Sequence, residues 1–284
     1  MRFAEGWKII MDNRQVNLHC HTALCKHATG SVRDYCLMAL EQGLKVLGFA
    51  EHSAFPDDRY GKTRMDYDQL ESYRQEIEDA RREFPTLTVL AGLEVDFDPA
   101  FPLDFYRKEL KERLELDYLV AGVHFAHDAA GKCIFAGANA HHNPEIVRLF
   151  TEKTVFLIRS GLFDFITHPD MVAGSIDRWT PEIRELFSQV IRASDECGVP
   201  LELNAYGLRK AEIHYPETIR HPYPWRPVWE LAAEIGIPCV IGSDAHRPDD
   251  VFGNMSDLFA FAEELGIPCI NAQVAKKIIH RKGK

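Results

Sequence analysis

Several features of common protein classes are missing from this sequence of 284 residues. No run approaches the roughly 18 consecutive apolar residues that a membrane-spanning helix needs, so we expect no membrane partner. Basic residues number 33 against 43 acidic ones, and a net charge of −10 argues against a protein held to nucleic acid by its overall charge. Low-complexity linkers are also absent. The hydrophobic fraction of 46% and the charged fraction of 27% exclude a disordered or fibrous chain.

A disulfide framework is not expected either. The seven cysteines are odd in number and include no C-x-x-C pair. Residues 1–15 carry five charged side chains and no long apolar core, so we expect no secretory leader. The cytoplasm, which keeps thiols reduced, is therefore the expected location. We expect Cys20 and Cys25 to be small packed side chains rather than metal ligands.

Seven short apolar runs predict the strands of a parallel sheet. Most are rich in Val, Ile, Leu or Phe and lack the alternation of a half-exposed strand, which is typical of strands buried on both faces. These runs are Val16–Leu18, Val46–Ala50, Thr88–Leu93, Tyr118–Val123, Phe163–Thr167, Pro200–Leu203 and Pro238–Gly242.

Helical patterns separate the runs and continue after the last one. They cover Ser31–Gln42, Asp66–Phe84, Leu103–Leu114, Pro144–Ser160, Pro181–Cys197, Pro227–Glu234, Met255–Leu265 and Ala272–Arg281. This alternation predicts right-handed βαβ units in one α/β domain that spans residues 1–284, and it suits an open sheet as well as a barrel. We expect a core of about residues 16–252, with the helices of residues 253–284 covering it.

Metal-ligand residue types follow six of the seven predicted strands. The C-terminal ends of parallel strands are where α/β barrels place their active sites. Residues i and i+2 of an extended segment point the same way. The two side chains of the H-x-H motif can therefore bind one ion together, and so can the two side chains of the D-x-H motif. Imidazole and carboxylate suit Zn, Mn or Fe, and nine ligands suggest two or three ions. The nine candidates are His19, His21, His27, His52, Glu94, His124, His168, Asp244 and His246. Glu51 is a candidate for orienting a ligand.

The order of these motifs resembles the PHP (polymerase and histidinol phosphatase) family from Val16 to about Phe252. The resemblance implies a distorted seven-stranded (β/α)7 TIM-like barrel, with three clustered metals at the C-terminal ends of the strands. Carried over position by position, it implies three ligand sets. The sets are His19, His21, Glu94 and Asp244; Glu94, His124 and His168; and His27, His52 and His246.

A second resemblance concerns the segment "LELNAYGLRK" at residues 201–210, which is similar to E-x-N-x-x-G-L-R-K of histidinol-phosphate phosphatases in that family. It implies that Asn204 and Arg209 face the substrate, with Lys210 nearby. The planar fork of an arginine suits phosphate, although a surface charge is the alternative interpretation of Arg209. Arg247 is a further phosphate candidate, and the polar segment Asp57–Arg64 is a candidate lid.

Together these residues predict a metal-dependent phosphomonoesterase, a hydrolase that converts L-histidinol phosphate to L-histidinol and phosphate in histidine biosynthesis. Metal-bound hydroxide would attack phosphorus, and Arg209 would neutralise phosphate charge. Asp244 or His246 would guide a proton to the leaving alkoxide. One alternative is a PHP phosphoesterase with another small phosphate ester or nucleotide as substrate. A metal-dependent amidohydrolase and a non-catalytic metal-binding module are the others. The sequence gives no indication of oligomeric state.

Overall fold

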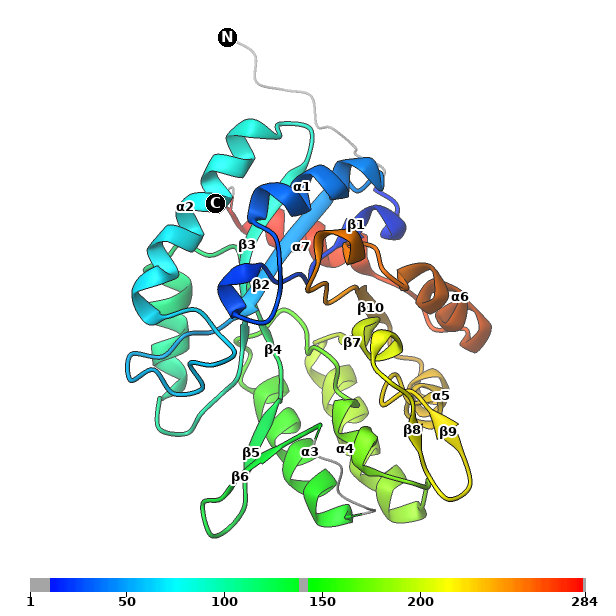
Figure 1. Ribbon diagram of the computed structural model, residues 1–284. Helices are drawn as coiled ribbons and strands as arrows, with labels where there is room; N and C mark the ends of the chain where they lie inside the picture. The colour runs from blue at the N-terminus through cyan, green and yellow to red at the C-terminus, as the bar shows by residue number, and fades with distance from the viewer. Residues whose placement is uncertain (1–10, 138–142, 283–284) are drawn as a thin grey trace.

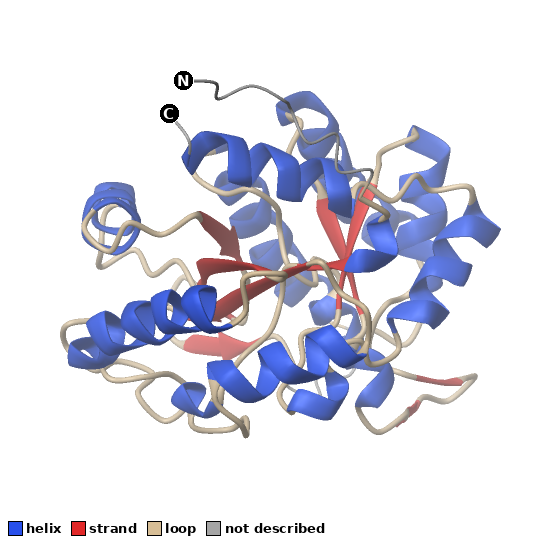
Figure 2. Cartoon of the chain, turned by 90° about the horizontal axis from the view of Figure 1, so that it is seen from above, coloured by secondary structure: helices blue, strands red, loops and turns tan. Residues whose placement is uncertain are grey.

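The computed structural model describes residues 11–137 and 143–282, so residues 1–10, 138–142 and 283–284 of the predicted domain lie outside the description. Strands occupy the centre of the molecule and helices lie around them (Figure 2). Four parallel strands pair in the order β1-β2-β3-β4, and two more pair as β10-β7. Their bounds are β1(Val16–Asn17), β2(Val46–His52), β3(Thr88–Val95), β4(Tyr118–Ala121), β7(Leu201–Asn204) and β10(Cys239–Gly242).

Isolated parallel bridges connect the two sets of strands. Ile166 pairs with both Ala121 and Leu201, and a further bridge joins Cys20 to Ala245. The strand expected at residues 163–167 is therefore present as an extended segment that hydrogen-bonds to both β4 and β7, with isolated bridges at Ile166 in place of a regular strand. The result is an α/β fold with a curled parallel sheet, and the closed seven-stranded barrel stays a prediction.

The expected helices are present, with ends that differ by a few residues. The side chain of Ser31 accepts a hydrogen bond from the backbone of Asp34 and begins α1, and Gly198 in a left-handed conformation ends α4. A π-helical segment, η4(Phe105–Glu112), replaces one predicted α-helix. The helices are α1(Val32–Glu41), α2(Leu70–Glu83), α3(Pro144–Arg159), α4(Pro181–Cys197), α5(Arg226–Ile235), α6(Met255–Leu265) and α7(Asn271–Lys282). None of the helices in the described chain is long and apolar enough to cross a membrane.

Two small antiparallel hairpins were not expected from the sequence. β5(Phe125–His127) pairs with β6(Cys133–Phe135) in the connection after β4, and β8(Ile213–His214) pairs with β9(Ile219–Arg220) after β7 (Figure 1). Strands of two or three residues leave too short a pattern to distinguish from a loop. Both hairpins follow the C-terminal ends of parallel strands, so they lie on the side of the sheet where the predicted ligands are found.

Alternate residues of the strands face two hydrophobic layers. Leu47 and Phe49 of β2 pack in the layer that contains the surrounding helices, whereas Val46 and Ala50 belong to an inner cluster. Helix α7 supplies four buried residues to the inner cluster, which are Ala272, Val274, Ala275 and Ile278. The strand ends that carry polar side chains are therefore fixed by packing on both faces of the sheet.

Candidate metal centre

The nine side chains predicted as ligands come together at the C-terminal ends of the parallel strands. His19, His21 and Glu94 are fully buried. The remaining six line a cavity of about 210 Å³, and they are His27, His52, His124, His168, Asp244 and His246. Residues separated by more than 200 positions thus share one small space, because the strands that precede them end at the same edge of the sheet.

The first group of side chains contains His19, His21, Glu94 and Asp244. The Nε2 atoms of His19 and His21 lie 3.0 Å apart. His21 Nε2 lies 3.2 Å from Asp244 Oδ1, and both Nε2 atoms lie 3.7 Å from Glu94 Oε2. Two imidazole nitrogens and two carboxylate oxygens therefore face the same point.

Glu94 also belongs to a second group, with His124 and His168. His168 Nε2 lies 2.8 Å from Glu94 Oε1, and His124 Nε2 lies 3.9 Å from Glu94 Oε2. The donor atoms of these three residues lie within 4.8 Å of one another. The carboxylate of Glu94 can therefore bridge the first group and the second.

The third group consists of His27, His52 and His246. The Nε2 atoms of His27 and His246 lie 3.0 Å apart, and the rings of His27 and His52 stack with centroids 5.3 Å apart. Their donor atoms also lie within 4.8 Å of one another. The residues of each ligand set that the family resemblance implies thus lie close together, and the assignment of ions to these sets stays a prediction.

The donor atoms of these groups fit divalent cations. Glu94 Oε2 and Asp244 Oδ1 are buried, and neither accepts a hydrogen bond from any residue in the described part of the chain. Leaving a buried carboxylate oxygen without a partner costs free energy, and a bound cation would satisfy both oxygens together with the neighbouring imidazole nitrogens. Nitrogen and carboxylate donors are those that Zn, Mn and Fe prefer.

The charges in the cluster shift its pKa values in opposite directions. Burial alone would lower the pKa of His19, but the carboxylates of Glu202, Asp244 and Glu94 outweigh burial and raise it well above the usual value. Burial alone would raise the pKa of Glu94. The imidazoles of His124, His19 and His168 outweigh burial and lower this pKa well below the usual value. The carboxylates thus hold positive charge close to them, as they would hold a metal ion.

Two buried carboxylates hold imidazole rings from behind. Asp96 Oδ2 accepts a hydrogen bond from His124 Nδ1 at 2.9 Å, and Glu202 Oε1 accepts one from His19 Nδ1 at 2.8 Å. Each bond places the proton on Nδ1 and directs the Nε2 lone pair into the cluster. Sequence reasoning missed both carboxylates, because each is distant in sequence from the histidine that it holds.

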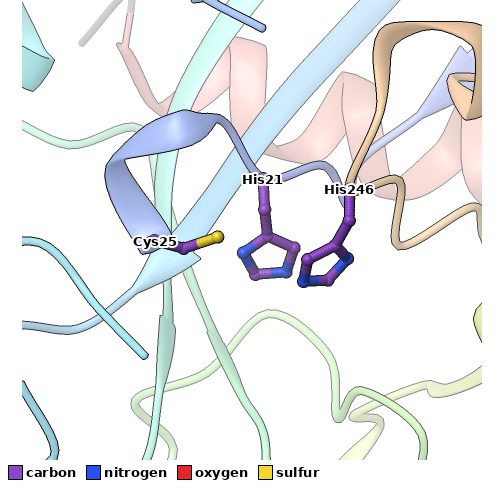
Figure 3. Close-up of side chains that lie close together, drawn as sticks. All are labelled: His21, Cys25 and His246. Atoms are coloured by element: carbon purple, nitrogen blue, oxygen red, sulfur yellow. The ribbon is translucent and has the colours of Figure 1, made fainter. Parts of the chain in front are cut away.

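Glu51 and Cys25 lie beside His21. Glu51 Oε2 lies 3.8 Å from His21 Nδ1, and Glu51 Oε1 accepts hydrogen bonds from the backbone and hydroxyl of Thr22. Figure 3 shows the sulfur of Cys25 pointing towards the ring of His21, with His246 on the other side of that ring. Burial raises the pKa of the Cys25 thiol to about 12, and the donor atoms of His21, Cys25 and His246 lie within 4.8 Å of one another.

Two glycines leave room for the buried carboxylates. A Cβ atom on Gly122 would lie 2.3 Å from Glu94 Oε1, and one on Gly242 would lie 1.9 Å from Glu202 Oε1. Non-bonded heavy atoms separate by about 3.5–4.0 Å at their best packing, so no side chain fits at either position without displacing a carboxylate.

The four predicted phosphate-binding residues take different positions. Lys210 lines the cavity, and its Nζ lies 4.1 Å from the centre of the Tyr206 ring. Asn204 is buried behind the cavity and donates hydrogen bonds to Glu202 and Asp244. The side chain of Arg247 is 66% exposed and pairs with an exposed aspartate, so it lies outside the cavity wall.

Arg209, the fourth candidate, directs its guanidinium group to the backbone. It donates to the carbonyl oxygens of Gly253 at 2.8 Å, Ser243 at 2.5 Å and Asp244 at 3.3 Å. Its side chain is 15% exposed and is not part of the cavity lining. The guanidinium group therefore fixes the backbone that carries Asp244.

Arg64 lines the cavity and was missed as a site residue. It is 2% exposed, and it donates to the backbone oxygen of Ser53 at 2.8 Å and to Asp96 Oδ2 at 3.1 Å. The sequence placed it at the end of the candidate lid, Asp57–Arg64, where its charge gave no sign that it is buried. Arg64 connects that segment to the carboxylate that holds His124.

Comparison with known proteins places this arrangement in a family. The family model of the PHP domain matches residues 17–206. The chain belongs to the PHP domain family. This PHP domain is 32% identical over 263 residues to the probable histidinol-phosphatase of Deinococcus radiodurans, a match that covers 87% of this chain and 92% of that protein. It is 28% identical to the histidinol-phosphatase of Bacillus subtilis, with 82% and 94% covered.

Two solved structures share the fold of this PHP domain. A candidate histidinol phosphatase from Listeria monocytogenes has a TM-score of 0.71 at 22% identity, and the match covers 85% of this chain and 98% of that one. The histidinol phosphate phosphatase of Lactococcus lactis, solved with zinc, L-histidinol and phosphate, has a TM-score of 0.65 at 18% identity, with 90% and 95% covered. At these identities the likeness concerns the fold.

Proposed function

We propose that this PHP domain is a metal-dependent phosphatase that hydrolyses L-histidinol phosphate to L-histidinol and phosphate. The observation that carries the proposal is the convergence of three donor groups on one cavity, two of them joined by Glu94. The names of the relatives from Deinococcus radiodurans and Bacillus subtilis support the choice of substrate. Zinc in the Lactococcus lactis structure supports Zn among the possible metals.

The nine side chains of the three groups would hold two or three divalent ions. When bound, such ions supply positive charge that polarises a phosphate ester and makes water a better nucleophile. His19 and His124 are held with their Nε2 atoms facing the cluster, because Glu202 and Asp96 each fix the opposite ring nitrogen. These hydrogen bonds keep the ligands in place before the substrate arrives.

Lys210 is the cationic side chain that we assign to the phosphate of the substrate. It lines the same cavity as His168, Asp244 and His246, and burial lowers its pKa. An ammonium group at the cavity wall can neutralise a phosphate oxygen. In this assignment Asp244 and His246 serve as ligands. Asn204 holds the carboxylate of Asp244 in position, and Arg209 holds its backbone.

The test of the proposal is phosphate release from L-histidinol phosphate by protein purified without chelator. The assay includes added Zn, Mn or Fe(II), and a generic aryl phosphate is run in parallel. We expect kcat/KM for L-histidinol phosphate to exceed that for the aryl ester by orders of magnitude. Absence of phosphate release from both esters with every metal would contradict a phosphatase.

A second candidate is a PHP phosphatase that acts on another small phosphate ester. A neighbouring cavity of about 480 Å³ shares Phe135, Met171, Lys210 and Tyr223 with the metal cavity, so there is room for an organic group larger than histidinol. A relative from Shewanella amazonensis, 24% identical over 84% of this chain, is named only as a probable phosphatase. Equal turnover of several sugar or nucleotide phosphates would favour this candidate over the first.

A further inference from the structure

Glu202 lies beneath the metal centre on β7, a strand that contributes no ligand to the three groups. Its side chain is fully buried. Oε1 accepts a hydrogen bond from His19 Nδ1 at 2.8 Å, and Oε2 accepts one from the backbone N–H of His168 at 3.1 Å. One carboxylate therefore contacts a residue of the first group and the backbone of a residue of the second.

Asn204 extends these contacts to a third ligand. Its Nδ2 donates to Glu202 Oε2 at 2.8 Å and to Asp244 Oδ2 at 3.1 Å. The backbone N–H of Tyr206 donates in turn to Asn204 Oδ1 at 2.9 Å, which fixes the orientation of the amide. Glu202 and Asn204 thus link His19, His168 and Asp244 in one buried network.

Glu202 faces the imidazole of His19 and has no lysine or arginine as an ion-pair partner among the described residues. Asp96, the other carboxylate behind an imidazole, has Arg64 at 3.1 Å. A buried carboxylate is costly unless positive charge lies near it, and divalent ions in the first two groups would add to the charge that His19 supplies.

We propose that Glu202 is a positioning residue whose buried charge raises the affinity of the first and second donor groups for divalent cations. It orients His19 directly, holds the backbone of His168, and acts on Asp244 through Asn204. The inference rests on the proposed function only in requiring that ions bind to these groups. Any chain with the same buried network would show the effect on metal binding, whatever ester it hydrolyses.

The test is Glu202→Gln, which keeps the size of the side chain and removes its charge. If the oxygen of the glutamine amide accepts the hydrogen bond from His19, its NH2 group faces the backbone N–H of His168 and the amide NH2 of Asn204. Both of these are donors, so the two hydrogen bonds that Glu202 Oε2 accepts are lost. Loss of such an outer partner typically weakens metal affinity about 10- to 100-fold. We expect the Kd for zinc, measured by competition with a chromophoric chelator, to rise by that factor for at least one ion. The visible spectrum of the Co(II)-loaded protein should change as well.

Gly242→Ala is an independent way to perturb the same carboxylate. The added Cβ would lie 1.9 Å from Glu202 Oε1, so the carboxylate must leave His19. We expect weaker zinc binding, in the same direction as in Glu202→Gln. Asp117→Asn is the matched control, because Asp117 is a buried carboxylate that precedes β4 and accepts from the backbone of Ala91, at the end of the strand opposite to His124. It should lower stability without changing zinc affinity or the Co(II) spectrum.

The outcomes separate this inference from the proposed function. Wild-type zinc affinity and an unchanged Co(II) spectrum in folded Glu202→Gln would overturn the positioning role. Equal losses of zinc affinity in Glu202→Gln and Asp117→Asn would show a general effect of instability and would overturn it too. If the wild-type chain releases phosphate from no ester while Glu202→Gln still binds zinc more weakly, the proposed function fails and the inference stands.

Discussion

Replacement of Arg209 by alanine tests whether this side chain binds phosphate or holds the backbone of the metal centre. The guanidinium group donates to the carbonyl oxygens of Gly253 at 2.8 Å and Ser243 at 2.5 Å. Hydrogen bonds from a charged group contribute roughly 1.5–3 kcal/mol each, and those to neighbouring atoms do not add fully. We therefore expect Arg209→Ala to lower the free energy of unfolding by about 3 kcal/mol, which is a fall in Tm of roughly 6 °C at about 2 °C per kcal/mol.

The kinetic consequence follows from the position of the freed backbone. Ser243 and Asp244 precede His246, so a looser backbone displaces two ligands and reduces metal content. We expect kcat to fall at fixed metal concentration and to recover in part with added metal, while KM for the phosphate ester stays within about twofold. Steady-state kinetics, thermal unfolding and metal analysis of the same preparation measure the three quantities.

The result that refutes this reasoning is a large rise in KM with unchanged Tm and metal content. It would show that the guanidinium group reaches phosphate in the complex, as the family resemblance implies. Arg247→Ala is the matched control, because its exposed side chain pairs with the exposed Asp249 and lies outside the cavity lining. It should leave Tm, metal content and KM unchanged.

Further predictions concern the ligands, a glycine, a lysine and the metal. His124→Ala should lower kcat by orders of magnitude and remove metal while circular dichroism shows the fold intact; near-normal turnover would contradict the second group. Gly122→Ala should displace Glu94 and reduce metal content to less than that of the wild type under the same purification. Burial lowers the pKa of Lys210, so its ammonium is lost as pH rises towards its ordinary value of 10.5; KM should rise there in the wild type but not in Lys210→Arg. Chelator should lower stability by about 2.7 kcal/mol if the ions had been at 100 times their Kd; an unchanged Tm would contradict metal binding.

Much of the metal centre follows from residue types at strand ends. His19, His52 and Asp244 follow apolar runs, and parallel strands bring their C-terminal ends to one edge. The sequence pattern therefore predicts which side chains gather, although not the distances between them. The run at residues 163–167 has strand composition and forms backbone hydrogen bonds with β4, yet it yields isolated bridges at Ile166 and no strand, because strand composition does not fix how many residues enter a ladder.

The contacts behind the ligands were not predictable in the same way. Glu202 lies in an apolar run, and His19, the imidazole that it holds, is 183 positions away. Arg64 has the composition of an exposed loop, yet it is buried against Asp96. Both contacts depend on the tertiary arrangement of separate strands, which no local period or spacing encodes.

β7 has a different role from its neighbours in the sheet. The other parallel strands carry a predicted ligand near or just after their C-terminal ends. β7 and the turn after it instead supply Glu202, Asn204 and Arg209, which form hydrogen bonds with predicted ligands or with their backbone. Glu202 holds an imidazole, Asn204 holds a carboxylate and Arg209 holds the backbone of that carboxylate. A substrate that bound to these side chains directly would break the hydrogen bonds that orient His19 and Asp244. Glu202, Asn204 and Arg209 therefore hold the predicted ligands in position and do not bind the substrate in this interpretation. Lys210 and Tyr206 are the members of the segment that line the cavity, and contact of the ester with Lys210 stays a prediction.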